Sequence, residues 1–211
     1  MNKVTTTRRT VLGAGLAAGV GGITAGGLLS GCAAGAAGGG WNVLFDGATS
    51  TDLVGWTPLG EGNWRVTDGT IEGRNGKAGF LVSADSYRDF EIESEFWADA
   101  DCNSGIFIRC QNRNEVTAAN AYEVNIFDKR PDPNYGTAAI VDVAKVARPF
   151  PQAANRWNTF RIFARGDWLQ VVFNGQITVD VRDARLREGP IALQSAGGTV
   201  RFRTVKIRKL G

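Results

Sequence analysis

Residues 168–181 read WLQVVF-NG-QITVDV, two alternating segments joined by the dipeptide Asn174-Gly175. Alternation of apolar and polar residues with a period of two is typical of a strand with one buried face. Asn-Gly is the dipeptide preferred in the two-residue type I′ turn, which requires positive φ at both central positions. The stretch therefore predicts a β-hairpin with strands at Trp168–Phe173 and Gln176–Val181.

A second hairpin is predicted on the N-terminal side, where Asp68-Gly69 joins Trp64–Thr67 to Thr70–Glu72. Further short alternating segments follow one another without a convincing amphipathic helix between them. This pattern predicts an all-β domain, a two-sheet β-sandwich or jelly roll. The remaining predicted strands are Phe80–Ser83, Phe90–Ala98, Ser104–Cys110, Tyr122–Asp128, Ala138–Val143, Asn158–Arg165, Ile191–Gln194 and Val200–Lys209.

The N-terminus has the features of an export signal. Thr7-Arg8-Arg9-Thr10-Val11-Leu12 resembles the twin-arginine signal, and Leu29-Ser30-Gly31-Cys32 resembles a bacterial lipobox, whose Cys is lipidated. A membrane-spanning helix is the alternative, but seven glycines between Val11 and Leu29 disfavour it. We expect a cleaved signal peptide (1–31), lipidated Cys32 with a flexible Gly/Ala-rich tether (32–40) and one folded domain (41–211), held at the cell envelope.

The absence of histidine and the positions of the cysteines exclude some kinds of catalytic site and a disulfide. The chain has 211 residues, 24 Lys+Arg, 21 Asp+Glu and no His, so reactions that need an imidazole base are excluded. Three of the basic residues lie in the leader, and the remaining charges balance. Strand spacing places Cys102 and Cys110 too far apart for a disulfide, so we expect two buried free thiols.

The charges of the folded domain are separated along the chain. Residues 32–155 carry 10 basic and 17 acidic side chains, whereas residues 156–211 carry 11 and 4. Because cross-strand pairing would neutralise both parts, we expect Phe90–Ala98, with Glu91, Glu93 and Glu95, to lie beside Asn158–Arg165 or Val200–Lys209. A nucleic-acid-binding patch on the last strand is the alternative; no aromatic stacking platform accompanies it, and no nucleic-acid partner is expected.

Motifs distributed over residues 41–210 resemble the bacterial 3-keto-disaccharide hydrolase family. No single motif is decisive, but their order is specific. The matching segments are Leu44-Phe45-Asp46-Gly47, Asp52-Leu53-Val54-Gly55-Trp56, Trp64–Gly69, Asp89–Ile92, Asn103–Arg109, Tyr122–Asp128, Trp157–Phe160, Val172–Gly175 and Gly189–Gln194. The resemblance implies a concanavalin-like jelly roll whose concave sheet holds a carbohydrate. It also implies a 3-keto-glycoside substrate, oxidised at C3 by a separate glycoside 3-oxidoreductase.

The chemistry of such a substrate can be stated independently. A ketone at C3 acidifies the proton at C2, so a carboxylate can remove it and the group on C1 can leave; water then adds. This requires a base, stabilisation of the enolate and a proton for the leaving oxygen. It requires no nicotinamide, histidine or metal in principle, so no cofactor is expected, although assistance by a divalent ion stays open.

Two residues are the candidate catalytic groups. Glu123 lies among apolar strand residues, where burial would raise the pKa of its carboxyl, and we interpret it as the base. Arg109 shares the predicted face of Phe107 and could bind the enolate through its fixed donors. The alternatives are a solvent-facing edge residue for Glu123 and a structural ion pair for Arg109.

Four residues are the candidate sugar-binding groups, namely Asn103, Asn125, Gln194 and Lys145. Asn103 could instead only cap a turn, and the two other amides could only satisfy backbone groups. Lys145 and Asp142 follow a segment that borders the site in the family. The six tryptophans are expected to be mostly core residues.

The sequence departs from the family in two places. Val141 stands where a Tyr is common, and Ser195-Ala196 follow Leu193-Gln194 where many members carry a His. If that His donates the leaving-group proton, this chain uses another acid or lacks the activity. A non-catalytic carbohydrate-binding module and a structural, protein-binding lipoprotein therefore remain alternatives. Convergence of Glu123, Arg109 and Asn103 in one pocket would favour the enzyme.

Overall fold

The computed structural model describes residues 40–74 and 76–211. The predicted signal peptide, Cys32 and most of the tether lie outside these residues. Within the described part, no helix is long and apolar enough to cross a membrane. The helical content of this part is one 3₁₀ turn, Pro133–Tyr135.

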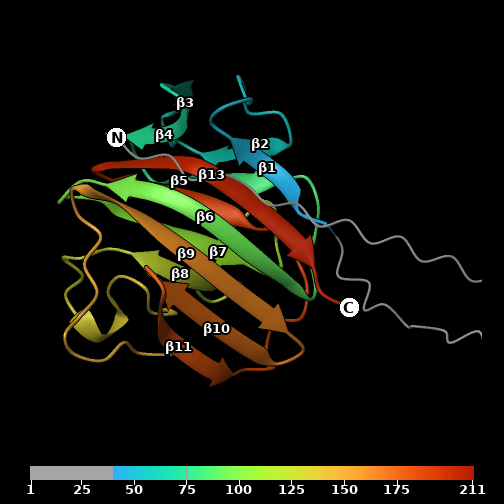
Figure 1. The fold of residues 1–211 in the computed structure, drawn as a ribbon, viewed down its shortest axis with the longest axis vertical. Helices are drawn as coiled ribbons and strands as arrows, with labels where there is room; N and C mark the ends of the chain where they lie inside the picture. Colours follow the sequence, from blue (N-terminus) through green and yellow to red (C-terminus); the bar gives the residue numbers. More distant parts are fainter. Residues whose placement is uncertain (1–39, 75) are drawn as a thin grey trace, which may run out of the picture. The chain divides into compact units, whose positions relative to one another are not determined.

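Two antiparallel sheets pack face to face, which confirms the predicted β-sandwich (Figure 1). The large sheet has the order β11 (Gln176–Arg182), β10 (Trp168–Phe173), β9 (Arg156–Arg165), β6 (Phe90–Ala98), β13 (Thr199–Lys209), β4 (Thr70–Arg74) and β3 (Trp64–Thr67), with β1 (Asn42–Asp46) also paired to β13. The small sheet has the order β2 (Trp56–Gly60), β5 (Gly79–Ser83), β12 (Ala192–Gly197), β7 (Asn103–Ile108) and β8 (Tyr122–Ile126).

Both predicted hairpins are present. Asp68 and Gly69 have φ of 48° and 66°, and Asn174 and Gly175 have φ of 49° and 82°. Positive φ at both central residues is the requirement of the type I′ turn. The hairpins β3–β4 and β10–β11 are therefore closed by the turns that the sequence specifies.

The predicted strand Ala138–Val143 is wrong. Ala138 and Asp142 adopt φ of 69° and 57°, which turn the chain away from an extended path. The segment instead follows β8 as a loop, because the Ala138 amide donates to the Asn125 carbonyl (2.9 Å) and the Val141 amide to the Glu123 carbonyl (3.0 Å). These bonds cover part of the outer edge of the small sheet.

The core between the sheets is apolar and aromatic. Phe96 stacks on Phe160 with ring centroids 4.9 Å apart, and Phe202 packs beside them. Cys102 and Cys110 are free and buried, as expected. The expectation of mostly buried tryptophans is wrong: all six are described, and Trp56 alone is buried. Trp64 is partly buried and packs against the core, whereas Trp97 and Trp157 lie on the outward side of β6 and β9, beside Arg201 and Arg203.

The charge separation along the chain is resolved by strand pairing. β6 lies between β9 and β13, so the predicted neighbours of Phe90–Ala98 are both confirmed. Glu91 is fully buried between Arg161 and Arg208, whose Nε atoms donate to its two oxygens at 3.0 and 2.6 Å. On the same face, Lys206 pairs with Glu93 at 2.9 Å.

Glu91→Ala is expected to lower the free energy of unfolding by about 1–3 kcal/mol, because two charge-assisted contacts to a buried carboxylate are lost. Glu93→Ala is the matched control, since Glu93 is 40% exposed and should cost at most about 1 kcal/mol. Urea unfolding of both variants measures the difference. Equal costs would contradict a special role for the Glu91 pairs.

Candidate functional site

The outward face of the small sheet collects most of the predicted site residues. β7 lies between β8 and β12, and Gly105 is directly opposite both Asn125 and Gln194. Two pairs further along, Glu123 is opposite Phe107. Because side chains alternate along a strand, these residues project to the same side of the sheet. We call this surface the site face.

Glu123 is the ionisable residue at the centre of the site face. Its side chain is 8% exposed, and burial raises the pKa of its carboxyl to about 7. The positive charge of Arg130 acts in the opposite direction, and the negative charge of Asp142 adds to the rise in pKa. A carboxyl with a pKa near neutrality can both accept and return a proton under physiological conditions.

The raised pKa of Glu123 predicts a pH-dependent stability. The carboxyl of Glu123 binds its proton more tightly in the folded chain than in the unfolded chain. The contribution of this proton to the free energy of unfolding is therefore complete below about pH 4.5 and is lost as pH rises through about 7. The free energy of unfolding of the wild type, relative to Glu123→Gln, should fall by about 3 kcal/mol between pH 4 and pH 8. Denaturant unfolding across this range measures it; a difference independent of pH would contradict the burial of a titrating carboxyl.

Two amide oxygens on the site face are available as hydrogen-bond acceptors. Asn125 is fully buried, and its Nδ2 donates to the Tyr135 carbonyl at 2.7 Å, which fixes the amide orientation. Its Oδ1 and the Oε1 of Gln194 are buried without a hydrogen-bond partner among the described residues. Buried acceptors without partners are uncommon in folded proteins, so these two oxygens are suited to donors of a bound ligand.

Gly105 lies between the two amides on the site face. A Cβ at this position would lie 3.0 Å from the Val124 carbonyl oxygen and 3.5 Å from Cγ of Glu123. Any side chain here would project between Asn125 and Gln194. The absence of a side chain at Gly105 therefore lets β7 and β8 pack closely at this point.

Aromatic side chains border the polar group. Phe80 is opposite Gln194 on β5, and its ring lies edge-on to that of Phe107 with centroids 5.2 Å apart. Val116, from the loop after β7, covers part of the same apolar cluster. A polar group beside apolar rings is the usual composition of a sugar-binding surface, since a pyranose has both hydroxyl groups and C–H faces.

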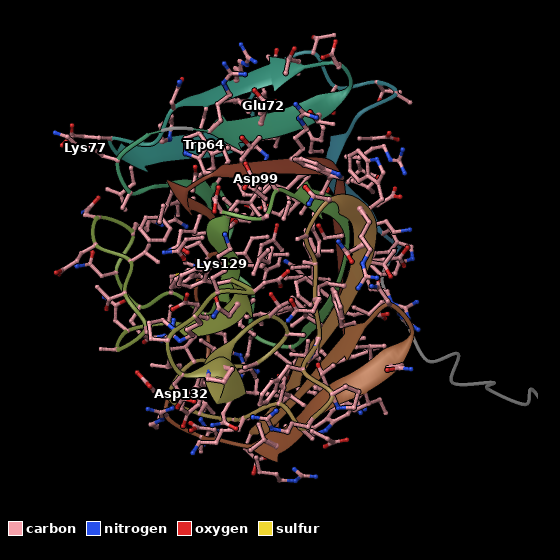
Figure 2. The ribbon with its side chains drawn as sticks, turned by 90° about the vertical axis from the view of Figure 1, so that its left-hand side faces the viewer. Trp64, Glu72, Lys77, Asp99, Lys129 and Asp132 are labelled. Carbon is pink, nitrogen blue, oxygen red and sulfur yellow. The ribbon has the colours of Figure 1, made fainter. Side chains whose placement is uncertain are left out.

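The other predicted binding residues lie at the margins. Asn103 is half-buried on β7, two residues before Gly105 and on the same side. Lys145 is exposed, with its Nζ 5.5 Å from the centre of the Tyr135 ring, and Asp142 is also exposed. Figure 2 labels Lys129 and Asp132, which lie in the segment between β8 and Tyr135.

The structure contradicts the catalytic interpretation of Arg109. Its φ of 53° breaks the alternation after β7, so its side chain does not follow Phe107 onto the site face. The guanidinium is fully buried. It donates hydrogen bonds to the backbone carbonyls of Arg88, Gly166 and Leu186 and to the carboxylate of Asp89. With its donors occupied by protein groups, Arg109 is a structural residue; Glu123 and Asn103 do not converge with it.

Arg130 is the charged residue that the sequence analysis missed. It lies in the bend after β8, close enough for its charge to lower the pKa of Glu123. No motif or spacing singled it out, since it follows Lys129 in a polar segment.

Ser195, which with Ala196 stands where the family resemblance implies a His, is buried on the opposite side of β12 against Gly73. It therefore does not replace that proton donor on the site face. The described residues also contain no group of three or more His, Cys, Asp or Glu side chains placed to hold a metal ion.

A family model described as the 3-keto-alpha-glucoside-1,2-lyase-like domain matches residues 40–208. The chain belongs to this family. The family assignment agrees with the motif resemblance, and the matched range includes every residue of the site face.

A curated 3-keto-disaccharide hydrolase from Bacteroides thetaiotaomicron is 29% identical to this 3-keto-alpha-glucoside-1,2-lyase-like chain. The match covers 58% of this chain and 52% of the relative, so the chain spans about half the length of that enzyme.

Two solved structures share the fold. A putative glycosyl hydrolase from Parabacteroides distasonis superposes with a TM-score of 0.70 at 18% identity, over 82% of this chain and 95% of that one. A carbohydrate-binding module, CBM66 from Bacillus subtilis, superposes with a TM-score of 0.56 at 22% identity, over 72% and 93% of the two chains. The sandwich architecture of this family member is therefore also found in a carbohydrate-binding module.

Proposed function

We propose that this protein cleaves 3-keto-glycosides by elimination at C1–C2 followed by hydration, with Glu123 as the base. The observation that carries the proposal is a buried carboxyl with a pKa of about 7, on one face with two unpartnered amide oxygens. The family match and the named hydrolase relative support the substrate class.

The amides would position the sugar ring across Gly105. Hydroxyl groups of the sugar would donate to Oδ1 of Asn125 and Oε1 of Gln194, which compensates the burial of these oxygens. Phe80, which packs edge-on against the buried Phe107, would contact the C–H surface of the ring or the aglycone. Asn103 and Lys145 lie at the margins of the site face, so they would contribute less to sugar binding than Asn125 and Gln194.

The proton transfer would begin at C2. The Glu123 carboxylate takes the proton made acidic by the neighbouring ketone, and the electron pair of the C–H bond enters the enolate. We assign the stabilisation of this negative charge to Arg130 in place of Arg109, because Arg130 is the cation that acts electrostatically on Glu123. As the C1–O bond breaks, Glu123 holds the proton that the departing oxygen needs; water then adds to the double bond.

The second candidate function is sugar binding without cleavage. The structural likeness to CBM66 favours it, as does the absence of a residue on the site face in place of the relatives' His. Both functions use the same amides, so affinity alone does not separate them.

Incubation of the full chain with a 3-keto-glucoside and with the unoxidised parent glucoside tests the proposal. We expect release of the 3-keto sugar from the oxidised substrate only, with a rate that rises with pH through about 7 as Glu123 ionises. Asp142→Asn should move this limb to lower pH, because Asp142 raises the pKa of Glu123. Saturable binding of the keto-glucoside with no product would instead establish the binding module.

We also propose export and lipid anchoring at Cys32 to the cell envelope, which rests on the twin-arginine and lipobox sequences. The substrate would be supplied by a separate glycoside 3-oxidoreductase. Metabolic labelling with an alkyne fatty acid tests the anchor: the wild type should be labelled and Cys32→Ser should not.

A further inference from the structure

The outward face of the large sheet, opposite the site face, carries an excess of positive charge. On this face, called here the basic face, seven basic side chains of β3, β4, β9 and β13 pair with only four carboxylates, which leaves an excess of three positive charges among these paired groups. The basic residues are Arg65, Arg74, Arg161, Arg201, Arg203, Lys206 and Arg208, and their partners are Glu72, Glu91, Glu93 and Glu95.

Tryptophans are interspersed with these cations. Lys206 and Arg208 each lie 4.8 Å from the centre of the Trp41 ring. Trp97 and Trp157 are opposite each other on β6 and β9, and Trp157 is 39% exposed. The guanidinium of Arg203 lies 4.2 Å from the centre of the Trp157 ring. The face thus combines indole rings with Arg and Lys over one continuous sheet, so the expectation that no aromatic side chains accompany the basic last strand is wrong.

The N-terminal edge of this face is also apolar. Val43, on β1, is 52% exposed and directly opposite Lys206 on β13. Trp41 lies two residues earlier and contacts the same lysine. In the sequence, Trp41 is nine residues after Cys32, a separation of at most about 30 Å for an extended chain.

We propose that the basic face docks on an anionic phospholipid surface. Tryptophan together with Arg and Lys is the composition found at membrane–water interfaces, where the ring lies at the headgroup level and the cation attracts anionic lipid. The excess of three positive charges is complementary to the negative charge of anionic lipid headgroups. The proposal goes beyond the proposed sugar chemistry; a lipid at Cys32 would bring this face to the membrane, but the docking does not require it.

This docking would orient the protein. The basic face and the site face are the outward faces of the two packed sheets, so they point in opposite directions. With the basic face on the membrane, Glu123, Asn125 and Gln194 would be directed to the aqueous side. Substrate and product would then exchange with solution rather than with the lipid surface.

The test uses the full chain carrying Cys32→Ser, sedimented with phosphatidylcholine vesicles with and without 30% phosphatidylglycerol. We expect binding that requires phosphatidylglycerol and weakens with salt. Arg203→Gln with Lys206→Gln should reduce the partition coefficient about tenfold. Both carboxylate partners, Glu95 and Glu93, are partly exposed, so this double variant should fold normally.

The matched control is Lys77→Gln with Lys129→Gln, which removes the same charge from ion-paired, exposed lysines away from the basic face. Its partition coefficient should lie within about twofold of that of the parent, which is the full chain carrying Cys32→Ser alone. All these proteins share the same leader, so its contribution cancels. Brominated lipid acyl chains provide a second readout: they should quench the fluorescence of the parent more than that of Trp41→Phe.

Three results would overturn the docking proposal. They are equal loss of binding by the two double variants, equal binding to vesicles without phosphatidylglycerol, and preferential binding to soluble polygalacturonate, which would identify an acidic polysaccharide as the partner. Turnover of a 3-keto-glucoside by the Arg203→Gln, Lys206→Gln variant should equal that of the parent, so this test and the test of the sugar chemistry fail independently.

Discussion

Glu123→Gln is expected to lower the turnover of a 3-keto-glucoside by about 10²–10⁴-fold. The substitution keeps the shape of the side chain but removes the only group on the site face that we assign as a base. The amides of Asn125 and Gln194 are left in place, so substrate affinity should change by less than about tenfold. Release of the 3-keto sugar under single-turnover conditions measures the rate, and calorimetry measures the affinity.

The matched control for this substitution is Glu115→Gln. Glu115 is an exposed acid in the loop after β7, so its loss changes the charge equally without touching the site face. Its turnover should match that of the wild type. Unchanged turnover in Glu123→Gln would remove Glu123 from the base role, whereas a large loss of affinity in this variant would show that Glu123 mainly binds the sugar.

Arg109→Met is expected to lower the free energy of unfolding by about 3–5 kcal/mol. Its fully buried guanidinium donates to three backbone carbonyls and to Asp89, which would be left without these donors. For a domain of this size, the loss corresponds to a decrease in Tm of about 10 °C. Turnover per folded molecule should be unchanged at temperatures below the transition.

Arg113→Met is the control for this effect. Arg113 also donates to two backbone carbonyls, those of Ser83 and Ala84, but it is exposed, and its loss should cost at most about 1 kcal/mol. A stable Arg109→Met protein with strongly reduced turnover would contradict the structural role and return Arg109 to the chemistry.

The prediction that Arg109 lies on the site face is wrong for a specific physical reason. The period-two pattern of Ser104–Cys110 assigned Arg109 to the face of Phe107, and this assignment is valid only while the backbone stays extended. A φ of 53° at Arg109 ends the strand and redirects the side chain towards Gly166 and Leu186, which are distant in sequence. The wrong strand at Ala138–Val143 has the same cause, since Ala138 and Asp142 also have positive φ.

Glu123 and Asn125 lie on one side of β8, as the alternation of residues in Tyr122–Asp128 indicates, because β8 remains extended. The sequence also predicts the strand Ser104–Cys110, but it did not predict that this strand lies between β8 and β12 and brings Gln194 to the same side. The burial of Glu123 depends on Phe107 from β7 and on the loop that pairs with β8, so its raised pKa appears only in the assembled sheet.

By itself, the sequence determined what depends on local residue chemistry: two type I′ hairpins, an all-β sandwich, buried free thiols and acidic strands that needed basic neighbours. The tertiary structure alone decided which cation meets which carboxylate and where Arg109 points. It also decided that Arg130 rather than Arg109 acts on Glu123, and that Trp41, Trp97 and Trp157 lie among the cations of the basic face. The division has one reason. Turn preference and side-chain alternation are properties of a few consecutive residues, whereas burial, pKa and charge excess are set by side chains that approach each other across strands far apart in the chain.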